Sequence, residues 1–316
     1  MTSAPIPDSC GDLTSLFPVD SVLESPSGSC FDWIDRSYGR IVQGTTGSAA
    51  IWSRRSEHGT ALVVGAVHTL GEGWFGPSNT AVTESIVNPG SLTGIARLFL
   101  VRPDGTGPDH LASPWFGLYN PDIAAERNNN LMQDLLPRED FYVAVADSQK
   151  LDVSGLPPMV DPIIADAVPM YDPTEATTTD PTWADAVEGD FVLLLGYPQT
   201  TGELTASVGR VLSDDEAEQA VAALADMGDP EGGVPYDPEA EMIIRGEAIA
   251  GMSGGGAVDR DGRLVGILVR ATDVHDGEQY VRAVRMSWVV NRLEATFAAL
   301  SPADQAAISG YLEPMG

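Results

Sequence analysis

The 316-residue sequence predicts an all-β protein built in two halves, and three observations lead to this expectation. The chain holds 33 glycines and 23 prolines, which favour short strands joined by many turns over long helices. Its apolar residues come in short runs bounded by turn-forming residues. A stretch rich in Pro, Asp and Thr, residues 152–188, separates two groups of such runs and is typical of a connector.

Four segments follow from this pattern. We expect an N-terminal extension over residues 1–38, because Pro, Ser, Gly and Asp dominate there and apolar residues are scattered. A first β unit covers 39–165, a second covers 166–300 together with a closing helix, and 301–316 form a C-terminal tail.

The first half contains four candidate strands. Gly39–Trp52 and Thr60–Val67 are predicted strands on either side of a charged turn, and the second leads into His68. Two further strands are expected at Leu92–Val101 and Asp140–Ala146. The polar stretch between them is predicted to be a loop with at most one short helix.

The second half combines strands with two helices. Its predicted strands are Gly189–Gly196, Glu241–Arg245, Arg263–Ala271 and Gln279–Val284. Ser213–Asp226 begins with an N-capping Ser and acidic residues, which predicts a short surface helix. Met286–Leu300 has the amphipathic pattern of a closing helix.

The charge of the chain restricts its partners. Seventeen basic and 46 acidic residues give a formal net charge of −29 at pH 7. Such a chain repels nucleic acid and anionic membranes and attracts cations. The acidity serves either to keep the protein soluble, at high salt for example, or to attract basic substrates. No apolar run is long enough to span a membrane, so a soluble protein is expected.

The two cysteines, Cys10 and Cys30, bear on the compartment. A disulfide between them would place the chain in an oxidising compartment, either secreted or periplasmic; two free thiols would fit the cytoplasm. The first residues lack the basic and apolar regions of a secretory signal, so localisation stays open.

One hexapeptide has the composition of a nucleophile loop. Gly251-Met-Ser-Gly-Gly-Gly256 lies between two predicted strands, and its glycines allow a tight turn around Ser253. Such a turn can aim the backbone N–H groups of Gly251 and Ser253 at one point, forming an oxyanion hole. His68 lies far upstream in Ala66-Val-His-Thr69 and is the candidate base. The G-x-S-x-G pattern also occurs in α/β-hydrolases, but His275, the only later His, lies too close to Ser253.

Several segments in the same order resemble trypsin-like and HtrA-like serine peptidases of the chymotrypsin fold. Leu62–Thr69 is similar to their strand and active-site His, and Gly47–Trp52 to the preceding strand. Gly189–Pro198 and Thr205–Val211 resemble the first strands of their second barrel. Gly251–Gly256 followed by Gly262–Val269 resembles their nucleophile loop and substrate-lining strand.

This resemblance spans about residues 39–300 and implies a bacterial-type serine endopeptidase with two six-stranded antiparallel β-barrels, the first carrying His and Asp and the second Ser. It assigns the triad His68, Asp140 and Ser253. Asp122 competes with Asp140 as the acid, because Asp122-Ile-Ala-Ala copies the start of the family motif but runs into Glu-Arg-Asn. Substrate would lie along Val269, Arg270 and Ala271.

Three residues refine the resemblance. Glu247 occupies the place of the pocket acid in trypsin-like enzymes, which implies cleavage after Arg or Lys. Met252 replaces the Asp that binds the freed N-terminus of activated trypsins, so a constitutively formed site is expected. Gly256 replaces a Pro that is common in the family at this place, so an inactive homologue remains one of the alternatives.

Other functions stay open at this stage. The alternatives are a catalytically inactive binding protein on the same fold, a serine esterase, and a structural acidic surface protein. No cofactor or metal is predicted, since Asp259–Gly262 and Ser213–Glu216 lack the ligand spacing of a calcium loop. The expected partner is a protein or peptide substrate.

Overall fold

The computed structural model describes the protein over nine stretches of the chain. These are residues 15–24, 28–37, 41–44, 47–55, 60–70, 98–101, 108–116, 136–147 and 183–299. Asp122 lies outside them, as do residues 152–182 of the expected connector and the C-terminal tail.

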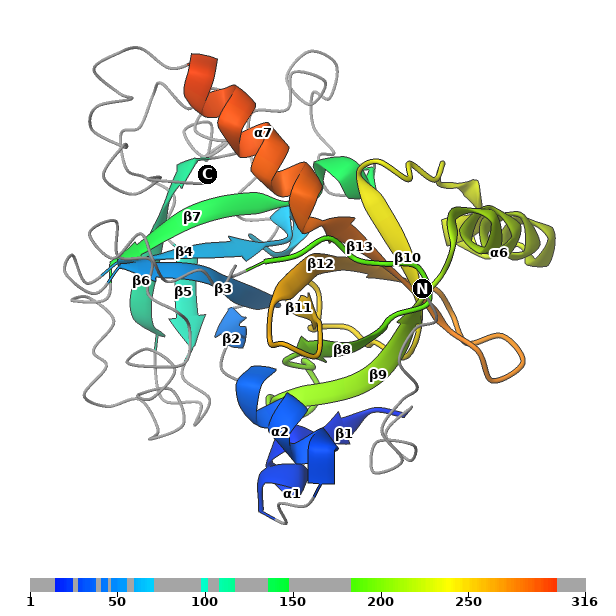
Figure 1. Cartoon of the computed structure of the whole chain (residues 1–316), viewed down its shortest axis with the longest axis horizontal. Coiled ribbons are helices and arrows are strands. Elements are labelled where there is room, and N and C mark those ends of the chain that lie inside the picture. Colours follow the sequence, from blue (N-terminus) through cyan, green and yellow to red (C-terminus); the bar gives the residue numbers. More distant parts are fainter. Residues whose placement is uncertain are drawn as a thin grey trace.

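The first half is a closed six-stranded barrel, seen in Figure 1 with its strands in blue to green. All neighbouring strands pair antiparallel in the order β2-β3-β4-β7-β6-β5. Their bounds are β2 Ile41–Gly44, β3 Ser48–Arg55, β4 Thr60–Gly65, β5 Leu98–Val101, β6 Pro108–Phe116 and β7 Tyr142–Asp147. Closure leaves none of these strands with an open edge along the ring.

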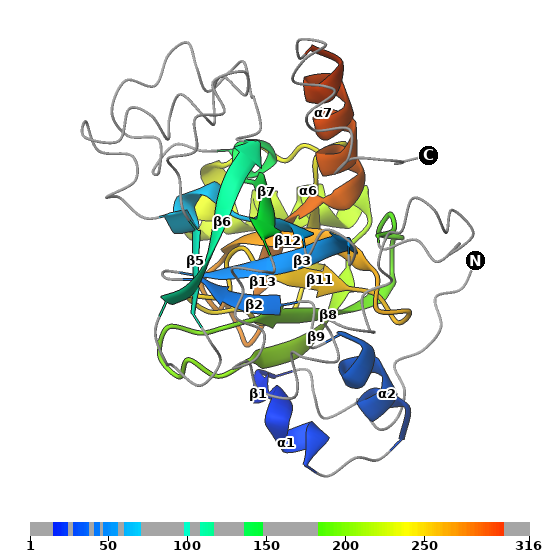
Figure 2. The same ribbon diagram turned by 90° about the vertical axis from the view of Figure 1, so that its left-hand side faces the viewer.

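The second half is a seven-stranded antiparallel sheet of order β1-β9-β10-β13-β12-β11-β8, in which β8 also pairs with β9. In Figure 2, β12 and β13 lie behind the strands of the first barrel, and β8 and β9 lie below them. Its strands are β1 Phe17–Pro18, β8 Phe191–Gly196, β9 Thr205–Val211, β10 Glu241–Arg245, β11 Gly256–Val258, β12 Leu264–Ala271 and β13 Tyr280–Arg285. The all-β prediction is confirmed.

Both predicted helices are present. Helix α6 (Asp214–Met227) begins at the N-cap Ser213, whose hydroxyl accepts a hydrogen bond from the Glu216 N–H, and the Glu216 side chain returns the bond. Helix α7 (Met286–Ala299) follows β13 directly and lies across one side of both halves (Figure 1). Short 3-10 helices occur at η3 (Val67–Leu70), η6 (Pro137–Glu139) and η10 (Pro230–Gly233).

The described part of the N-terminal segment is more ordered than its composition predicts. It forms β1 and the helices α1 (Val19–Leu23) and α2 (Gly28–Ser37), which lie below β8 and β9 in Figure 1. Several of its apolar residues are buried, among them Phe17, Trp33 and Ile34. Cys30 is disulfide-bonded. Cys10, the only other cysteine, lies outside the described residues.

Three strand predictions need correction. Gly39–Trp52 is not one strand, because β2 and β3 are antiparallel neighbours with Ile41 opposite Ala50. Strand β6 occupies part of the expected loop. Its polar residues and prolines are not typical of a strand, but β6 pairs with both β5 and β7 and thereby closes the barrel. Strand β11 was not predicted, because three residues are too short for a periodic pattern.

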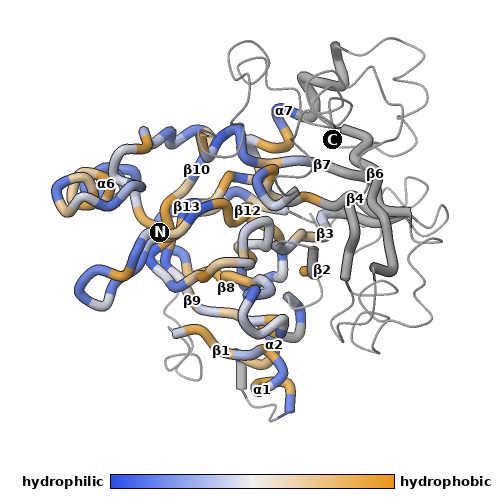
Figure 3. The backbone as a smooth tube through the Cα atoms, turned by 180° about the vertical axis from the view of Figure 1, so that it is seen from behind, coloured by the Kyte–Doolittle hydropathy of each residue, from blue (hydrophilic) through white to orange (hydrophobic). Residues whose placement is uncertain are grey.

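One hydrophobic core joins the two halves. A single cluster includes Trp52 and Val64 of the first barrel together with Leu193 and Ile267 of the second sheet. Figure 3 shows hydrophobic residues along β8, β10 and β12. Among the described residues, no helix has the length and apolar character needed to cross a bilayer.

A buried ion pair lies between strands β10 and β13. Arg282 is 1% exposed and binds both carboxylate oxygens of Glu241 at 2.8 Å. Its guanidinium also donates to the carbonyls of Val234 and Pro235. Arg282 therefore fixes the loop after η10 to the sheet.

We expect Arg282→Leu to lower the free energy of unfolding by about 3–5 kcal/mol, because it leaves the buried Glu241 carboxylate without a partner. Chemical denaturation measures the loss. The control is Arg245→Leu, whose half-exposed side chain forms a 3.6 Å ion pair with Glu278 and should contribute less than about 1 kcal/mol. Equal effects of the two variants would contradict the assignment.

Candidate active site

His68 and Asp140 are brought together by the pairing of β4 with β7. His68 lies in η3, directly after β4, and Asp140 lies between η6 and β7. Because Gly65 at the end of β4 is opposite Tyr142 at the start of β7, the segments beyond these two residues meet. The barrel register thus places the histidine beside the carboxylate.

Two hydrogen bonds fix the pair. Nδ1 of His68 lies 2.6 Å from Oδ2 of Asp140, and the backbone N–H of His68 donates to Oδ1 at 3.0 Å. The Asp140 side chain is 2% exposed, whereas the His68 side chain is 28% exposed. The carboxylate therefore holds the Nδ1–H tautomer and leaves Nε2 free to act as a base.

The electrostatics of His68 favour the protonated imidazole. Burial by itself lowers the pKa of His68, but attraction to Asp140 and their hydrogen bond outweigh it, so the pKa lies above its ordinary value of 6.5. Arg270 acts in the opposite direction and lowers this pKa.

Ser253 lies in the loop between β10 and β11, and the backbone of this loop is tightly fixed. Gly251 and Gly254 have φ angles of 101° and 83°, a region that favours glycine. The N–H of Gly254 donates to the carbonyl of Leu268 on β12 at 2.7 Å. This bond anchors the loop to the neighbouring strand.

The N–H groups of Gly251 and Ser253 donate no hydrogen bond within the described part of the chain, whereas the N–H groups of Met252, Gly254 and Gly255 do. The peptide group that contains the Gly251 N–H has the Ala250 carbonyl, which accepts from the Gln199 N–H. The peptide group that contains the Ser253 N–H has the Met252 carbonyl, which accepts from the Gly255 N–H. In a trans peptide the N–H points away from its carbonyl, so both orientations are set. Two fixed, unused donors are what an oxyanion hole requires.

Ser48, the first residue of β3, connects the first barrel to this loop. Its N–H donates to the carbonyl of Ser253 at 2.8 Å, and its hydroxyl donates to the carbonyl of Gly251 at 2.8 Å. The same hydroxyl accepts from the N–H of Tyr197, just after β8. Ser48 is 1% exposed, so these bonds form in a dry interior.

Close backbone contact brings the Ser253 loop to the His68 segment. A Cβ added at Gly47 would lie 2.6 Å from Cγ2 of Thr69 and 2.8 Å from the carbonyl oxygen of Ser253. One added at Gly254 would lie 3.1 Å from the N of Ala66. Only glycine allows the two segments to approach this closely.

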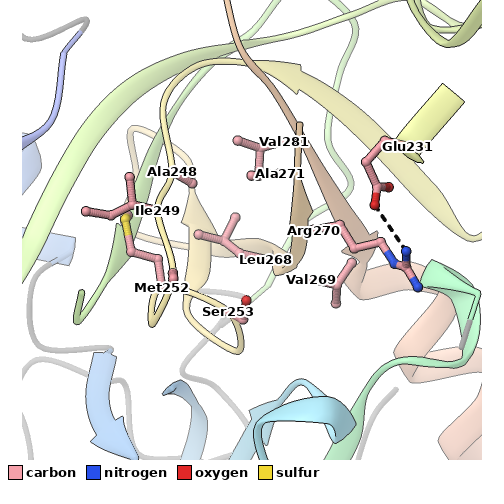
Figure 4. Close-up of a pocket in the computed structure, with 11 residues that line it drawn as sticks. Glu231, Ala248, Ile249, Met252, Ser253, Leu268, Val269, Arg270, Ala271 and Val281 are labelled. Atoms are coloured by element: carbon pink, nitrogen blue, oxygen red, sulfur yellow. Dashed lines mark hydrogen bonds and ion pairs between the residues drawn. The ribbon is translucent and has the colours of Figure 1, made fainter. Parts of the chain in front are cut away.

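A pocket of about 330 Å³ opens beside Ser253 (Figure 4). Most of its wall is apolar, and the Glu231–Arg270 ion pair lies at one side, with 3.1 Å between the charged atoms. The lining residues are Glu231, Ala248, Ile249, Ala250, Met252, Ser253, Leu268, Val269, Arg270, Ala271 and Val281.

Comparison with known proteins gives a match to the model of the trypsin-like peptidase domain over residues 144–267. Over these residues the chain is similar to trypsin-like peptidases. No curated protein matches it. Among solved structures it is similar to Rv3671c of M. tuberculosis, in an inactive Ser343Ala form, at 14% identity and a TM-score of 0.43 over 95% of this chain and 98% of that one. It is also similar to a serine endoprotease of Yersinia pestis, at 13% identity and a TM-score of 0.41 over 85% of this chain and 66% of that one.

The structure gathers most of the sequence-predicted site residues. Val269, Arg270 and Ala271 line the pocket with Ser253. Glu247 does not line it; its Oε2 accepts the N–H of Leu16, at the start of the described N-terminal segment, at 3.1 Å. The carboxylate in the pocket wall is Glu231 instead.

Two residues of the candidate site were not found from the sequence. Ser48 gave no signal, because its partners Gly251 and Ser253 are some 200 positions away and no local motif surrounds it. Glu231 lies in an acidic stretch after α6 where nothing distinguishes it from its neighbours. Both acquire their roles only from tertiary contacts.

The remaining candidates have structural partners. His275 Nε2 lies 2.8 Å from the buried Asp229 carboxylate in the loops beside the pocket, so this second His–Asp pair ties two loops together. Asp259 accepts from the N–H groups of Asp261 and Arg263, as in a turn. Within the described stretches, no three His, Cys, Asp or Glu side chains are grouped as metal ligands would be.

We expect the pKa of His68 to fall in Asp140→Asn, because the attraction is removed while burial remains. In Arg270→Gln it should rise, because a cation that opposes protonation is lost. NMR titration of the imidazole C–H signals measures both shifts. A pKa that stays above 6.5 in Asp140→Asn would contradict the role of the carboxylate.

We expect Ser48→Ala to slow the phosphonylation of Ser253 by a fluorophosphonate about tenfold or more, because the Gly251 peptide loses its anchor. The control is Ser207→Ala, which removes an equally buried hydroxyl bonded to the Glu247 carbonyl. Both variants should lose similar stability, measured by thermal unfolding, but only Ser48→Ala should lose reactivity. An equal loss of reactivity in Ser48→Ala and Ser207→Ala would show that Ser48 acts only through packing.

Proposed function

We propose that this chain is a serine endopeptidase in which Ser253 is the nucleophile, His68 the general base and Asp140 the residue that orients the base. The observation that carries the proposal is the combination of a fixed Nδ1–carboxylate bond with two unused N–H donors at the Ser253 loop. Together these two features match what acyl transfer requires.

The proposed reaction proceeds through an acyl-enzyme. Nε2 of His68 takes the proton of the Ser253 hydroxyl as its oxygen attacks the carbonyl carbon of a peptide bond. The N–H groups of Gly251 and Ser253 stabilise the negative oxygen of the tetrahedral intermediate. Protonated His68 gives its proton to the leaving amine, and water, activated in the same way, releases the acyl group.

Strand β12 supports an extended peptide as substrate. Strand β11 begins at Gly256, opposite Ile267, so in the described part of the chain Arg270 and Ala271 have a strand partner on the β13 side alone, and Val269 lies at a bulge in that pairing. A peptide can add to this edge as an antiparallel strand, which places its side chains alternately toward the pocket and away from it. An extended peptide binding of this kind favours an endopeptidase over an esterase.

The second sheet fits the second barrel of the chymotrypsin-like fold. Because β8 pairs with both β9 and β11, the pairings of β8–β13 form a ring of six strands. We propose that this ring is the second barrel and that Ser253 lies on it as the resemblance implies. Cleavage after Arg or Lys, expected from Glu247, has weaker support, because this carboxylate binds the N-terminal segment.

Intact-mass analysis after exposure to a fluorophosphonate tests the nucleophile. We expect a single adduct on the native chain, none on Ser253→Ala, and at least about 10³-fold slower labelling of His68→Ala. Ser213→Ala, which loses only the cap of α6, serves as the serine control and should label like the native chain. A folded native chain that takes no adduct would favour the inactive binding protein.

The labelling rate should rise with pH through a midpoint above 6.5, because only neutral His68 can take the Ser253 proton and its pKa is raised. The rate is therefore lowest in acid and reaches a plateau above the pKa of His68. Matched amide and ester substrates then separate a peptidase from an esterase. A rate independent of pH between 5 and 9 would contradict His68 as the base.

A further inference from the structure

The pocket beside Ser253 is a continuation of a hydrophobic core. Ala248, Met252, Leu268 and Val281 line it and are at most 4% exposed, and all four belong to one apolar cluster beneath it. Figure 4 shows Val281 and Ala271 side by side, beyond Leu268 as seen from Ser253. They are also a cross-strand pair of β12 and β13, so their positions are set by the sheet.

The only described carboxylate in the pocket wall is already compensated. Oε1 of Glu231 lies 3.1 Å from the Arg270 guanidinium, and Oε2 lies 3.7 Å from that of Arg282. Arg282 is in turn paired with Glu241, so two carboxylates and two guanidiniums form a network without net charge. Oε2 of Glu231 has no hydrogen-bond partner, but two cations already surround this carboxylate.

We propose that the pocket selects an uncharged aliphatic side chain, of the size of Val, Leu or Met, on the acyl side of the cleaved bond. This inference rests on the proposed function and replaces the preference for Arg or Lys expected from Glu247. Glu247 cannot supply the charge, because it does not line the pocket and its Oε2 binds the Leu16 N–H.

The size and polarity of the wall determine the preference. Each buried methylene of the substrate adds about fourfold to the rate constant, so Leu should exceed Ala by more than about tenfold. A Lys or Arg side chain in the same pocket would lose hydration without meeting an uncompensated carboxylate. Basic substrates should therefore react at least about tenfold more slowly than Leu.

Peptidyl phosphonates that differ only in this side chain provide the test. Intact mass gives the rate of Ser253 modification of the full chain by the Ala, Val, Leu, Met, Phe, Arg, Lys and Glu compounds. We expect the aliphatic compounds Val, Leu and Met to react fastest and the charged ones slowest. Arg or Lys at or above the rate of Leu would overturn the inference, and so would an absence of selectivity.

Two variants check that the pocket itself sets the order. Val281→Ala removes two carbons from the buried part of the wall, so the Phe compound should gain about tenfold relative to the Val compound. Val208→Ala removes the same carbons from the other core cluster and should leave the order of compounds as it is. A gain for Phe in both variants, or in neither, would contradict the assignment.

The simple fluorophosphonate separates the two levels of the proposal. If it modifies Ser253 but the rates of the peptidyl phosphonates follow another order, the proposed nucleophile is supported and the proposed aliphatic preference is wrong. If it fails to modify the folded native chain, the proposed function itself falls.

Discussion

The hydrogen bonds of Ser48 are the constraint on which the candidate site depends. One residue at the start of β3 binds the carbonyls of Gly251 and Ser253 and accepts from the N–H of Tyr197, and so joins the first barrel to two segments of the second half. Because His68 and Asp140 lie in the first half and Ser253 in the second, the geometry of the site depends on how firmly the two halves are joined. A buried polar side chain suits this task, since its bonds are directional where apolar packing is not.

The junction is reinforced from other directions. The hydrophobic core is continuous from Trp52 and Val64 to Leu193 and Ile267, which supplies the affinity of the halves for each other. On the far side, the indole N–H of Trp288 in α7 donates to the carbonyl of Arg138, two residues before Asp140. The closing helix therefore holds the segment that carries the carboxylate, and both His68–Asp140 and Ser253 are fixed relative to one frame.

Charge is distributed unevenly between the surface and the site. The net charge of −29 belongs to the chain as a whole, whereas the pocket wall contains a compensated network of Glu231, Arg270, Arg282 and Glu241. Long-range attraction of cations and local selection of a side chain are thus separate properties. Arg270 affects both the pocket and the base, because its side chain lines the pocket and its charge lowers the pKa of His68.

The sequence by itself determined the all-β class, helices α6 and α7, and the candidate loop of Ser253, because these depend on local patterns: strand periodicity, a capping Ser, and a glycine turn. The resemblance to a known family added His68 and Asp140, with Asp122 as a competing acid. Tertiary structure alone decided the rest. Strand β6 exists because barrel closure requires it, the place of Glu247 depends on its contact with Leu16, and Ser48 acts across some 200 residues. Interactions at such separations leave no periodicity or spacing in a single sequence, since they are fixed by how the chain folds back on itself.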